Sequence, residues 1–378
     1  MYKHVFKRRI IFLLISCAVF LSCCQRSDKD LAITAIEADI TSDAELTLSE
    51  YFENFKMLKL PSDIIIGEIE RIKYENNRIY ISDRQHSLFI FCEDGNLLTH
   101  FQKRGMGPGE YSRITDFMID GEDIIVLDRN QHRLLTYDHS GESLSTRGIG
   151  YYAQAISPLV DNTFFLFLGN DYSHKLRRFS NGQEDSAYLE VDEDLSYLFI
   201  FSVQNFFRHQ ESIYFFQPFN DTVYKSTSGG PIKPFFYVDF KGNNAPESFY
   251  KRHKDVVTFS NELQGSSYAV GVNNFALNDR FLMFSSFYQG NHKLTVFDRN
   301  NDISKTYAAI RDDIYLPGLS IPVSQFNYHA SQRIIVPLDA FAVAEWRDAH
   351  PPSVQFEDMV NATEEEDNPL LLIFDFKQ

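Results

Sequence analysis

"RIYISDRQHSLFIFCEDGNLL" (78–98) is the stretch of sequence that decides the fold. It joins two apolar runs, rich in β-branched and aromatic residues, through a polar turn that starts Asp83-Arg84, and it includes Asp94-Gly95. Such runs predict strands, and Asp-Gly predicts a tight hairpin. The same order of features returns in "DIIVLDRNQHRLLTYDHSGESL" (123–144), where Asp128-Arg129 stands 45 residues further along. The stretch is therefore one copy of a repeat.

Weaker copies of this unit follow along the chain. They span 163–183, 212–230 and 280–302, and an interrupted sixth unit spans 333–346 and 368–376. Short strands that repeat with a period in the mid-forties are the sequence signature of propeller blades. Aromatic residues make up 15% of the chain, which also favours sheet. We predict an all-β fold, a six-bladed β-propeller of four-stranded antiparallel blades, over residues 46–378.

"FQKRGMGPGEYSRI" (101–114) lies between the first two units and is rich in glycine. Glycine-rich loops either hold phosphate at the start of a helix or turn the chain sharply between strands. The sequence that follows it reads as strand, turn and strand, with no helix. We therefore predict a link from the outer strand of one blade to the inner strand of the next.

The first residues read as an export signal. "MYKHVFKRR" (1–9) is basic, and "IIFLLISCAVFLSCC" (10–24) is apolar but short for a membrane span. The segment ends in Leu21-Ser22-Cys23-Cys24, which resembles the lipobox of bacterial lipoproteins, in which a cysteine becomes the lipidated N-terminus. Cys24 is preferred over Cys23 because Leu21 supplies the aliphatic residue three places before it. A plain cleaved signal and an uncleaved anchor are the alternatives.

The blade pattern resembles NHL-type repeats, which also have an aspartate in the middle turn and a glycine-rich link. More closely, the chain resembles the six-bladed β-propeller lipoproteins of the Bacteroidota. The resemblance rests on the lipobox, "GMGPGEY" (105–111), "PFNDTVY" (218–224) and "NPLLLIFDF" (368–376). It implies a propeller in the cell envelope, and it implies no particular activity.

These features divide the chain into segments. We expect a lipoprotein signal peptide at 1–23, a flexible acidic tether at 24–45 and the propeller at 46–378. Charged or proline-broken excursions at about 241–267 and 345–368 are insertions, either solvated decoration or contacts for a lid or partner. Residues 46–60 should supply a strand that pairs within the blade ending at 368–376, because an unsealed ring exposes two strand edges.

Composition excludes several classes of protein. The formal net charge is −16, and the leader holds basic residues and no acidic ones, so the mature surface should repel nucleic acid. Cys92 is the one cysteine outside the leader, so no intrachain disulfide is expected, and its apolar neighbours predict a buried side chain. Metal-ligand spacings and nucleophile motifs are missing from the sequence, and we expect no cofactor and no metal.

A candidate ligand-binding face follows from the strand order. In an antiparallel four-stranded blade, the middle turn and the link to the next blade lie at the same end of the strands. The polar residues expected at that end are Asp83, Arg84, His86, Arg104, Glu110, Asp128, Arg129, His132, Asn170, Asp171, His174, Asn220, Asp221, Asn291, His292 and Asp339. Aspartate and asparagine also favour turns for local reasons, whereas turns have no need of arginine. Arg84 and Arg129 are therefore the strongest candidates.

Two functions fit these observations. The first is a lipid-anchored module of the cell envelope, on the outer membrane, that binds a protein, glycan or small ligand at one mouth of the propeller. The second is a propeller enzyme, a hydrolase or lyase with a polar or metal-containing axial site. Propellers serve both uses, so the fold does not decide. The missing catalytic motifs favour the binding module.

Overall fold

The computed structural model describes residues 33–159, 162–198, 204–326, 329–330, 333–350 and 356–378. The chain divides into two compact units, 1–34 and 35–378, and the sheets belong to the second. The predicted signal peptide, Cys23 and Cys24 lie outside the described residues.

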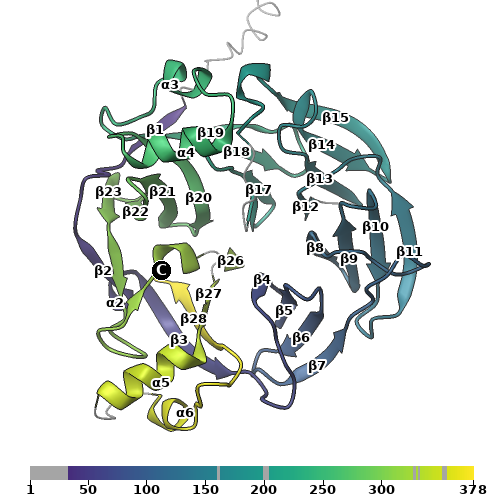
Figure 1. Cartoon of the computed structure of the whole chain (residues 1–378), viewed down its shortest axis with the longest axis vertical. Helices are drawn as coiled ribbons and strands as arrows, with labels where there is room; N and C mark the ends of the chain where they lie inside the picture. The colour runs from purple at the N-terminus through teal and green to yellow at the C-terminus, as the bar shows by residue number, and fades with distance from the viewer. Residues whose placement is uncertain (1–32, 160–161, 199–203, 327–328, 331–332, 351–355) are drawn as a thin grey trace, which may run out of the picture. The chain divides into compact units, whose positions relative to one another are not determined.

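The sheets follow one another around a common centre (Figure 1). In chain order, the first sheet consists of β4 (Ile69–Glu75), β5 (Arg78–Asp83), β6 (Leu88–Cys92) and β7 (Leu97–Phe101). The second sheet consists of β8 (Asp116–Asp120), β9 (Asp123–Asp128), β10 (Arg133–Tyr137) and β11 (Ser143–Gly148). The third sheet consists of β12 (Ala155–Pro158), β13 (Thr163–Phe167), β14 (His174–Ser180) and β15 (Gln183–Glu190). The fourth sheet consists of β16 (Phe206–His209), β17 (Ser212–Phe215), β18 (Thr222–Thr227) and β19 (Lys233–Asp239), with β1 (Thr34–Glu37) at the edge. The fifth sheet consists of β20 (Ala269–Leu277), β21 (Phe281–Tyr288), β22 (Asn291–Asp298) and β23 (Ile303–Tyr307). The sixth sheet consists of β26 (His329–Ala330), β27 (Arg333–Leu338), β28 (Leu370–Phe376) and β3 (Phe52–Lys59). The first strand of each sheet is the one nearest the centre. The predicted propeller of four-stranded antiparallel sheets is confirmed.

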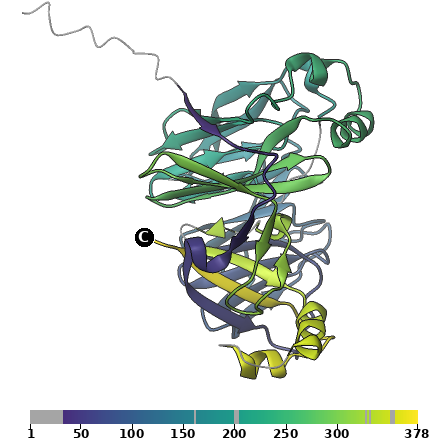
Figure 2. The same ribbon diagram turned by 90° about the vertical axis from the view of Figure 1, so that its left-hand side faces the viewer.

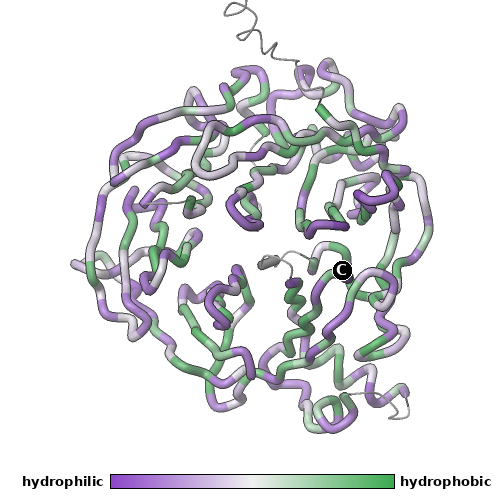
Figure 3. Tube along the Cα trace, turned by 180° about the vertical axis from the view of Figure 1, so that it is seen from behind, coloured by the Kyte–Doolittle hydropathy of each residue, from purple (hydrophilic) through white to green (hydrophobic). Residues whose placement is uncertain are grey.

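Burial on both faces explains why the strands read as continuous apolar runs. Ile79 and Ile81 of β5 pack into one hydrophobic cluster, whereas Tyr80, which points to the other face, packs into the next. Successive side chains of a strand point to opposite faces, so each sheet lies between two layers of core. Figure 3 shows the same pattern as apolar stretches within the sheets and hydrophilic stretches at many of the connections.

The prediction of six blades is corrected, because the described residues form seven sheets. The seventh sheet has three strands, β2 (Glu45–Thr47), β24 (Ala309–Arg311) and β25 (Ser320–Ile321), and β2 pairs parallel with β24. Leu46 and Ile310 are fully buried there, and Arg311 binds both carboxylate oxygens of Glu45 at 3.0 Å. Strands of two and three residues carry no repeat pattern, and the sequence predicted no strand over residues 309–321.

The expected tether at 24–45 is also corrected over its described part. β1 is a fifth strand on the outer edge beside β19, and Ile36, Ala38 and Ile40 are buried. The nitrogen of Ala38 donates to the carbonyl of Asp239 at 2.8 Å, which extends the pairing beyond β1. The packed unit therefore begins about ten residues before the predicted boundary at 46.

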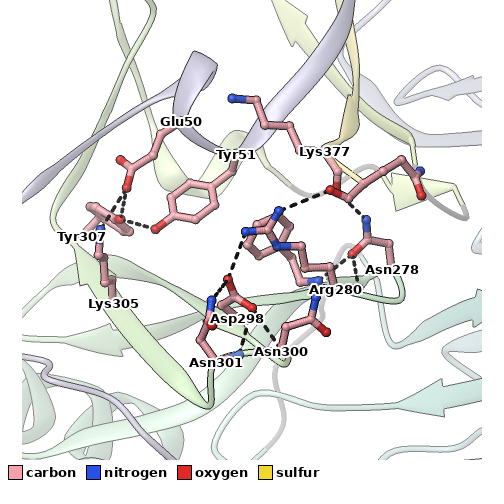
Figure 4. A network of polar contacts seen from close by, with 12 residues as sticks. Glu50, Tyr51, Asn278, Arg280, Asp298, Asn300, Asn301, Lys305, Tyr307 and Lys377 are labelled. Carbon is pink, nitrogen blue, oxygen red and sulfur yellow. Dashed lines mark hydrogen bonds and ion pairs between the residues drawn. The ribbon is translucent and has the colours of Figure 1, made fainter.

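The predicted closure is confirmed. β3 and β28 pair antiparallel, with Leu372 opposite Met57 and Leu371 opposite Leu58, so residues from both ends of the propeller share one sheet. Beside this pair, the Tyr51 hydroxyl lies 2.6 Å from the Tyr307 hydroxyl. The side chains of Asn278 and Arg280 donate to the last two carbonyls of the chain, as Figure 4 shows.

Short helices occupy the connections. They are α2 (Leu48–Tyr51), the 3-10 turn η1 (Glu193–Leu195), α3 (Glu247–Lys251), α4 (Val256–Gln264), the 3-10 turn η2 (Val323–Gln325), α5 (Ala340–Ala349) and α6 (Glu357–Asn361). The first predicted insertion contains α3 and α4, and the second excursion begins at α5, earlier than predicted. In Figure 2 these two helical groups project on one side of the sheets and the C-terminus lies on the other. Cys92 is partly exposed rather than buried, because it is the last residue of β6.

Replacing Leu372 with alanine should lower the free energy of unfolding by about 2–5 kcal/mol, because a fully buried side chain of the closing strand is lost. Leu98→Ala is the matched control, since Leu98 is 51% exposed on the outer strand β7. Urea denaturation measures both changes. Equal small effects would show that the closing strand contributes no more than a surface strand.

Candidate functional site

The middle turns and the links between sheets lie on one face of the propeller, which we call the link face. The Tyr111 hydroxyl, in the link from β7 to β8, donates to the carbonyl of His86, in the turn from β5 to β6, at 2.8 Å. Gln102 reaches the carbonyl of Gln85 in the same turn, also at 2.8 Å. The opposite face, which carries the hairpins β4–β5 and β6–β7, is called the hairpin face. The strand order therefore places the predicted polar residues on one face.

The glycine-rich link (105–111) folds so that its backbone binds the side chain of Glu110. The Glu110 carboxylate accepts a hydrogen bond from the nitrogen of Gly107 at 2.8 Å. Gly109 has φ +69°, a conformation that favours glycine, and a Cβ on Gly105 would lie 2.0 Å from the Glu110 carboxylate and displace it. No helix follows the link, and Arg104 within it is exposed. The loop is a turn between sheets, as predicted, and Glu110 points into it.

The aspartates of the repeat hold the turns together. Asp83 is fully buried and accepts from the backbone nitrogens of Ser87 and Gly67 at 2.8 and 3.0 Å. Asp128, also fully buried, accepts from the nitrogen of Ser112 at 2.7 Å. Each carboxylate thus joins the end of the second strand to the segment entering the first strand of the same sheet. These two repeat aspartates fix the backbone, which is the local role that aspartate often has in turns.

Three further predicted residues have similar roles. Asp221 accepts from the nitrogen of Gly271 at 2.7 Å, and burial raises the pKa of its carboxyl group. Asn220 accepts from the nitrogen of Thr222 at 2.9 Å. Asp339 accepts from the nitrogen of Phe341 at 2.9 Å and caps α5. All three side chains stabilise the connections that carry them.

The predicted histidines do not form one site. His86 and His132 occupy equivalent turn positions with φ 65° and 52°, a left-handed conformation. His174 lies 3.1 Å from the Ser173 hydroxyl, and burial lowers the pKa of His292, which packs against Phe287. Within the described ranges, no group of three or more His, Cys, Asp or Glu residues could hold a metal ion.

The side chain of Asn170 lies beside a small pocket, and Asp171 next to it is exposed. The amide of Asn170 donates to the carbonyls of Leu195 and Leu198 at 3.2 and 2.8 Å. The pocket has a volume of about 20 Å³, which is far below the usual size of a ligand site. It is lined by Gln154, Phe167, Gly169, Asn170, Leu198, Gln217, Pro218 and Phe219.

The two arginines of the repeat have different surroundings. Arg84 is exposed and pairs with Glu68, which is also exposed. Arg129 is 7% exposed, and its guanidinium lies over the ring of Tyr152, 5.0 Å from the centroid. Burial lowers the pKa of Arg129. An arginine held in this way has lost most of its contact with water and gains more from a bound anion than Arg84 does.

A cluster of charged residues at the centre of the ring was missed by the sequence analysis. We call it the axial cluster. It consists of Glu70, Arg71, Lys73, Glu75, Arg113, Asp116 and Arg208. Four of these residues come from β4, the innermost strand of its sheet, and Asp116 and Arg208 come from the innermost strands β8 and β16. The signal in the sequence was "IERIKYE" (69–75), an inner strand in which charged residues alternate with apolar ones.

The ion pairs of the axial cluster run from the link face to the hairpin face. Near the link face, Arg113 lies 3.4 Å from Glu70. Below this pair, Asp116 lies 2.9 Å from the Lys73 ammonium and 3.8 Å from the Arg71 guanidinium. Burial lowers the pKa of the Lys73 ammonium. Adjacent inner strands are therefore joined by charged side chains at the centre.

The last ion pair crosses the centre of the ring. Arg208 lies 3.8 Å from Glu75, although β16 and β4 belong to sheets that are not neighbours (Figure 1). β16 also contacts β26, which confirms that the centre is narrow at this level. The pair spans the axis on the hairpin side, and about two fifths of each of its two side chains is exposed.

A family model matches residues 31–375 of the chain, nearly the whole of the described part. Its description is Domain of unknown function (DUF4934). The chain belongs to the DUF4934 family. Among proteins with curated descriptions, none matches this DUF4934 protein.

Solved structures similar to this DUF4934 protein include one from Bacteroides fragilis NCTC 9343, provisionally named as an exported protein. It has 18% sequence identity and a TM-score of 0.73, and the match covers 92% of this chain and 100% of that one. A member of the duf4221 family from Bacteroides vulgatus has 9% identity and a TM-score of 0.49, with 86% and 98% covered. Virginiamycin B lyase from Staphylococcus aureus has 12% identity and a TM-score of 0.42, with 75% and 82% covered. The first of these likenesses supports the propeller fold.

Replacing Asp128 with alanine should lower the free energy of unfolding by about 2–3 kcal/mol, because buried backbone N–H groups lose a charged acceptor. Asp120→Ala, at the exposed end of β8, is the matched control and should change it by less than about 0.5 kcal/mol. Urea denaturation measures both. An Asp128→Ala protein as stable as the control would contradict the structural role of the repeat aspartates.

Proposed function

We propose that this DUF4934 protein is a binding module of the bacterial cell envelope that recognises a protein, glycan or small ligand at the link-face mouth of the propeller. The observation that carries the proposal is the convergence of charged side chains from β4, β8 and β16 at the centre of the ring. Polar groups held on separate rigid strands suit selective binding, because the ring fixes their positions before a ligand arrives.

The chemistry of these groups favours binding over catalysis. Arginine stays protonated in proteins and donates hydrogen bonds, so Arg71, Arg113 and Arg129 suit recognition and not proton transfer. The carboxylates nearby are already engaged, Glu70 with Arg113 and Asp116 with Lys73. A hydrolase or lyase remains the alternative, and His86, whose pKa is lowered by burial, is a candidate base for it.

Anchoring through a lipid is the second part of the proposal. It is supported by the basic, apolar and cysteine-terminated order of residues 1–24. No helix in the described parts of the chain is long and apolar enough to cross a bilayer. We propose that residues 1–23 are removed, that Cys24, or alternatively Cys23, carries the lipid, and that the protein resides on the outer membrane.

The binding proposal is tested with a library of soluble oligosaccharides, peptides and metabolites, screened by thermal shift. For each ligand found, Arg84→Ala combined with Arg129→Ala should weaken binding by at least about 1 kcal/mol, since charge-assisted hydrogen bonds at the mouth are lost. The Arg129→Ala single variant should account for most of the loss.

Lys305→Ala is the control, because Lys305 is an exposed cation at the hairpin face that pairs with Glu50 (Figure 4). Ligands whose binding is weakened by Lys305→Ala and not by the arginine variants would place the binding site on the hairpin face, opposite to the proposed one. Chemical conversion of a ligand by the wild-type protein would favour the enzyme alternative.

The anchor is tested by labelling cells with radioactive fatty acid. The wild-type protein should incorporate label and sediment with membranes, and a protein with both Cys23→Ala and Cys24→Ala should do neither. Cys92→Ala is the matched control and should label normally. Label that persists in the double variant would exclude lipidation at this cysteine pair.

A further inference from the structure

The centre of the ring is cationic in a chain that is strongly acidic. Together with Arg129, the axial cluster brings five cations against three carboxylates. The whole chain has a formal net charge of −16. Fixed cations in a partly enclosed site attract anions more strongly than the same cations on an open surface, because fewer water molecules screen them.

The carboxylates of the cluster do not use all of its donors. Arg113 contacts Glu70 through one terminal nitrogen at 3.4 Å, a long distance for this type of hydrogen bond. Its Nε is buried and, among the described residues, has no hydrogen-bond partner. The Nδ1 of His86, which lies near Glu70 and Arg113, is also buried without one. Buried donors normally have acceptors, so the Arg113 Nε–H indicates that the mouth is built for a group that brings acceptor oxygens, and His86 joins it as a donor in the Nδ1–H tautomer.

Two of the three acidic residues of the axial cluster are engaged by groups other than Arg113. Asp116 is held by the backbone nitrogens of Phe117 and Ile156 as well as by Lys73. Glu75 lies at the hairpin side, where it pairs with Arg208. Glu70 is therefore the one carboxylate of the cluster that competes with a ligand for Arg113.

We propose that the link-face mouth binds an oxyanion group of its ligand, a carboxylate or a phosphate, between Arg113, Arg71 and Arg129. This inference rests on the proposed function and adds the chemical class of the ligand. The guanidinium of Arg113 donates to the oxyanion in place of Glu70, and Arg71 and Arg129 contribute positive charge from two sides. Glu70 acts as the internal anion that occupies the site when no ligand is bound.

Calorimetric titration of the purified protein with inorganic phosphate, and separately with acetate, tests the proposal at constant ionic strength. The wild-type protein should bind at least one of the two, and which one binds decides between phosphate and carboxylate. Arg113→Gln should raise the dissociation constant about tenfold, through the loss of a charge-assisted hydrogen bond. Glu70→Gln should lower it at least about threefold, because a competing negative charge is removed.

Lys254→Gln is the matched control. It removes the same unit of charge from an exposed lysine on the α3–α4 insertion, away from the axis, and should leave the dissociation constant unchanged. Thermal unfolding of each variant checks that it is folded. Because Glu70→Gln is expected to strengthen binding, a loss of fold cannot imitate the result.

Several outcomes would overturn the inference. Absence of binding by both anions to the wild-type and Glu70→Gln proteins would do so, as would binding that neither axial variant changes. If neutral library ligands still depend on Arg129 in that case, the proposed function stands and only the oxyanion assignment fails. If ligands respond to Lys305→Ala instead, the proposed function fails as well.

Discussion

The pairing of β3 with β28 is the constraint on which the rest of the structure depends. It places residues 52–59 and 370–376 in one sheet, so the ring has no free end at this point. The sheet also positions β26 against β4, and thereby sets how closely the inner strands approach the axis. The meeting of Arg208 with Glu75, from sheets that are not neighbours, is a consequence of that closure. Residues before β3 are left on the outside, where β1 and β2 add strands to existing sheets.

Two kinds of polar residue emerge from this architecture, and they do different things. The repeat aspartates Asp83 and Asp128 are buried within single sheets and satisfy backbone nitrogens, so they stabilise turns. The axial residues contact one another between sheets, so their arrangement depends on the whole ring. Asp116 belongs to both groups, since it accepts from two backbone nitrogens and also pairs with Lys73. A ligand bound at the axis would therefore contact residues from several sheets at once.

Local sequence patterns predicted the strands and turns that depend on residues close together in the sequence. Apolar runs, the Asp-Arg turn and the glycine-rich link identified the first two sheets, and the apolar run at 370–374 identified the closing strand. The seventh sheet was missed because β2 pairs in parallel with a strand more than 250 residues away. The axial cluster was missed because its residues come from different sheets, which only the closed ring brings together. Arg84 and Arg129 have identical places in the repeat, yet one meets Glu68 and the other Tyr152, residues from neighbouring segments that no motif specifies.

The most direct measurement of the central claim is a crystal structure of the protein grown with selenate, recorded at the selenium absorption edge. The anomalous signal locates the anion without reference to any assumed ligand. We expect a peak on the link side of the axis, about 4 Å from the Arg113 guanidinium nitrogens and close to Arg71 and Arg129, so that a selenate oxygen lies within hydrogen-bond distance of Arg113. Selenate bound only on the hairpin face or at contacts between molecules, with Arg113 still paired to Glu70, would contradict it.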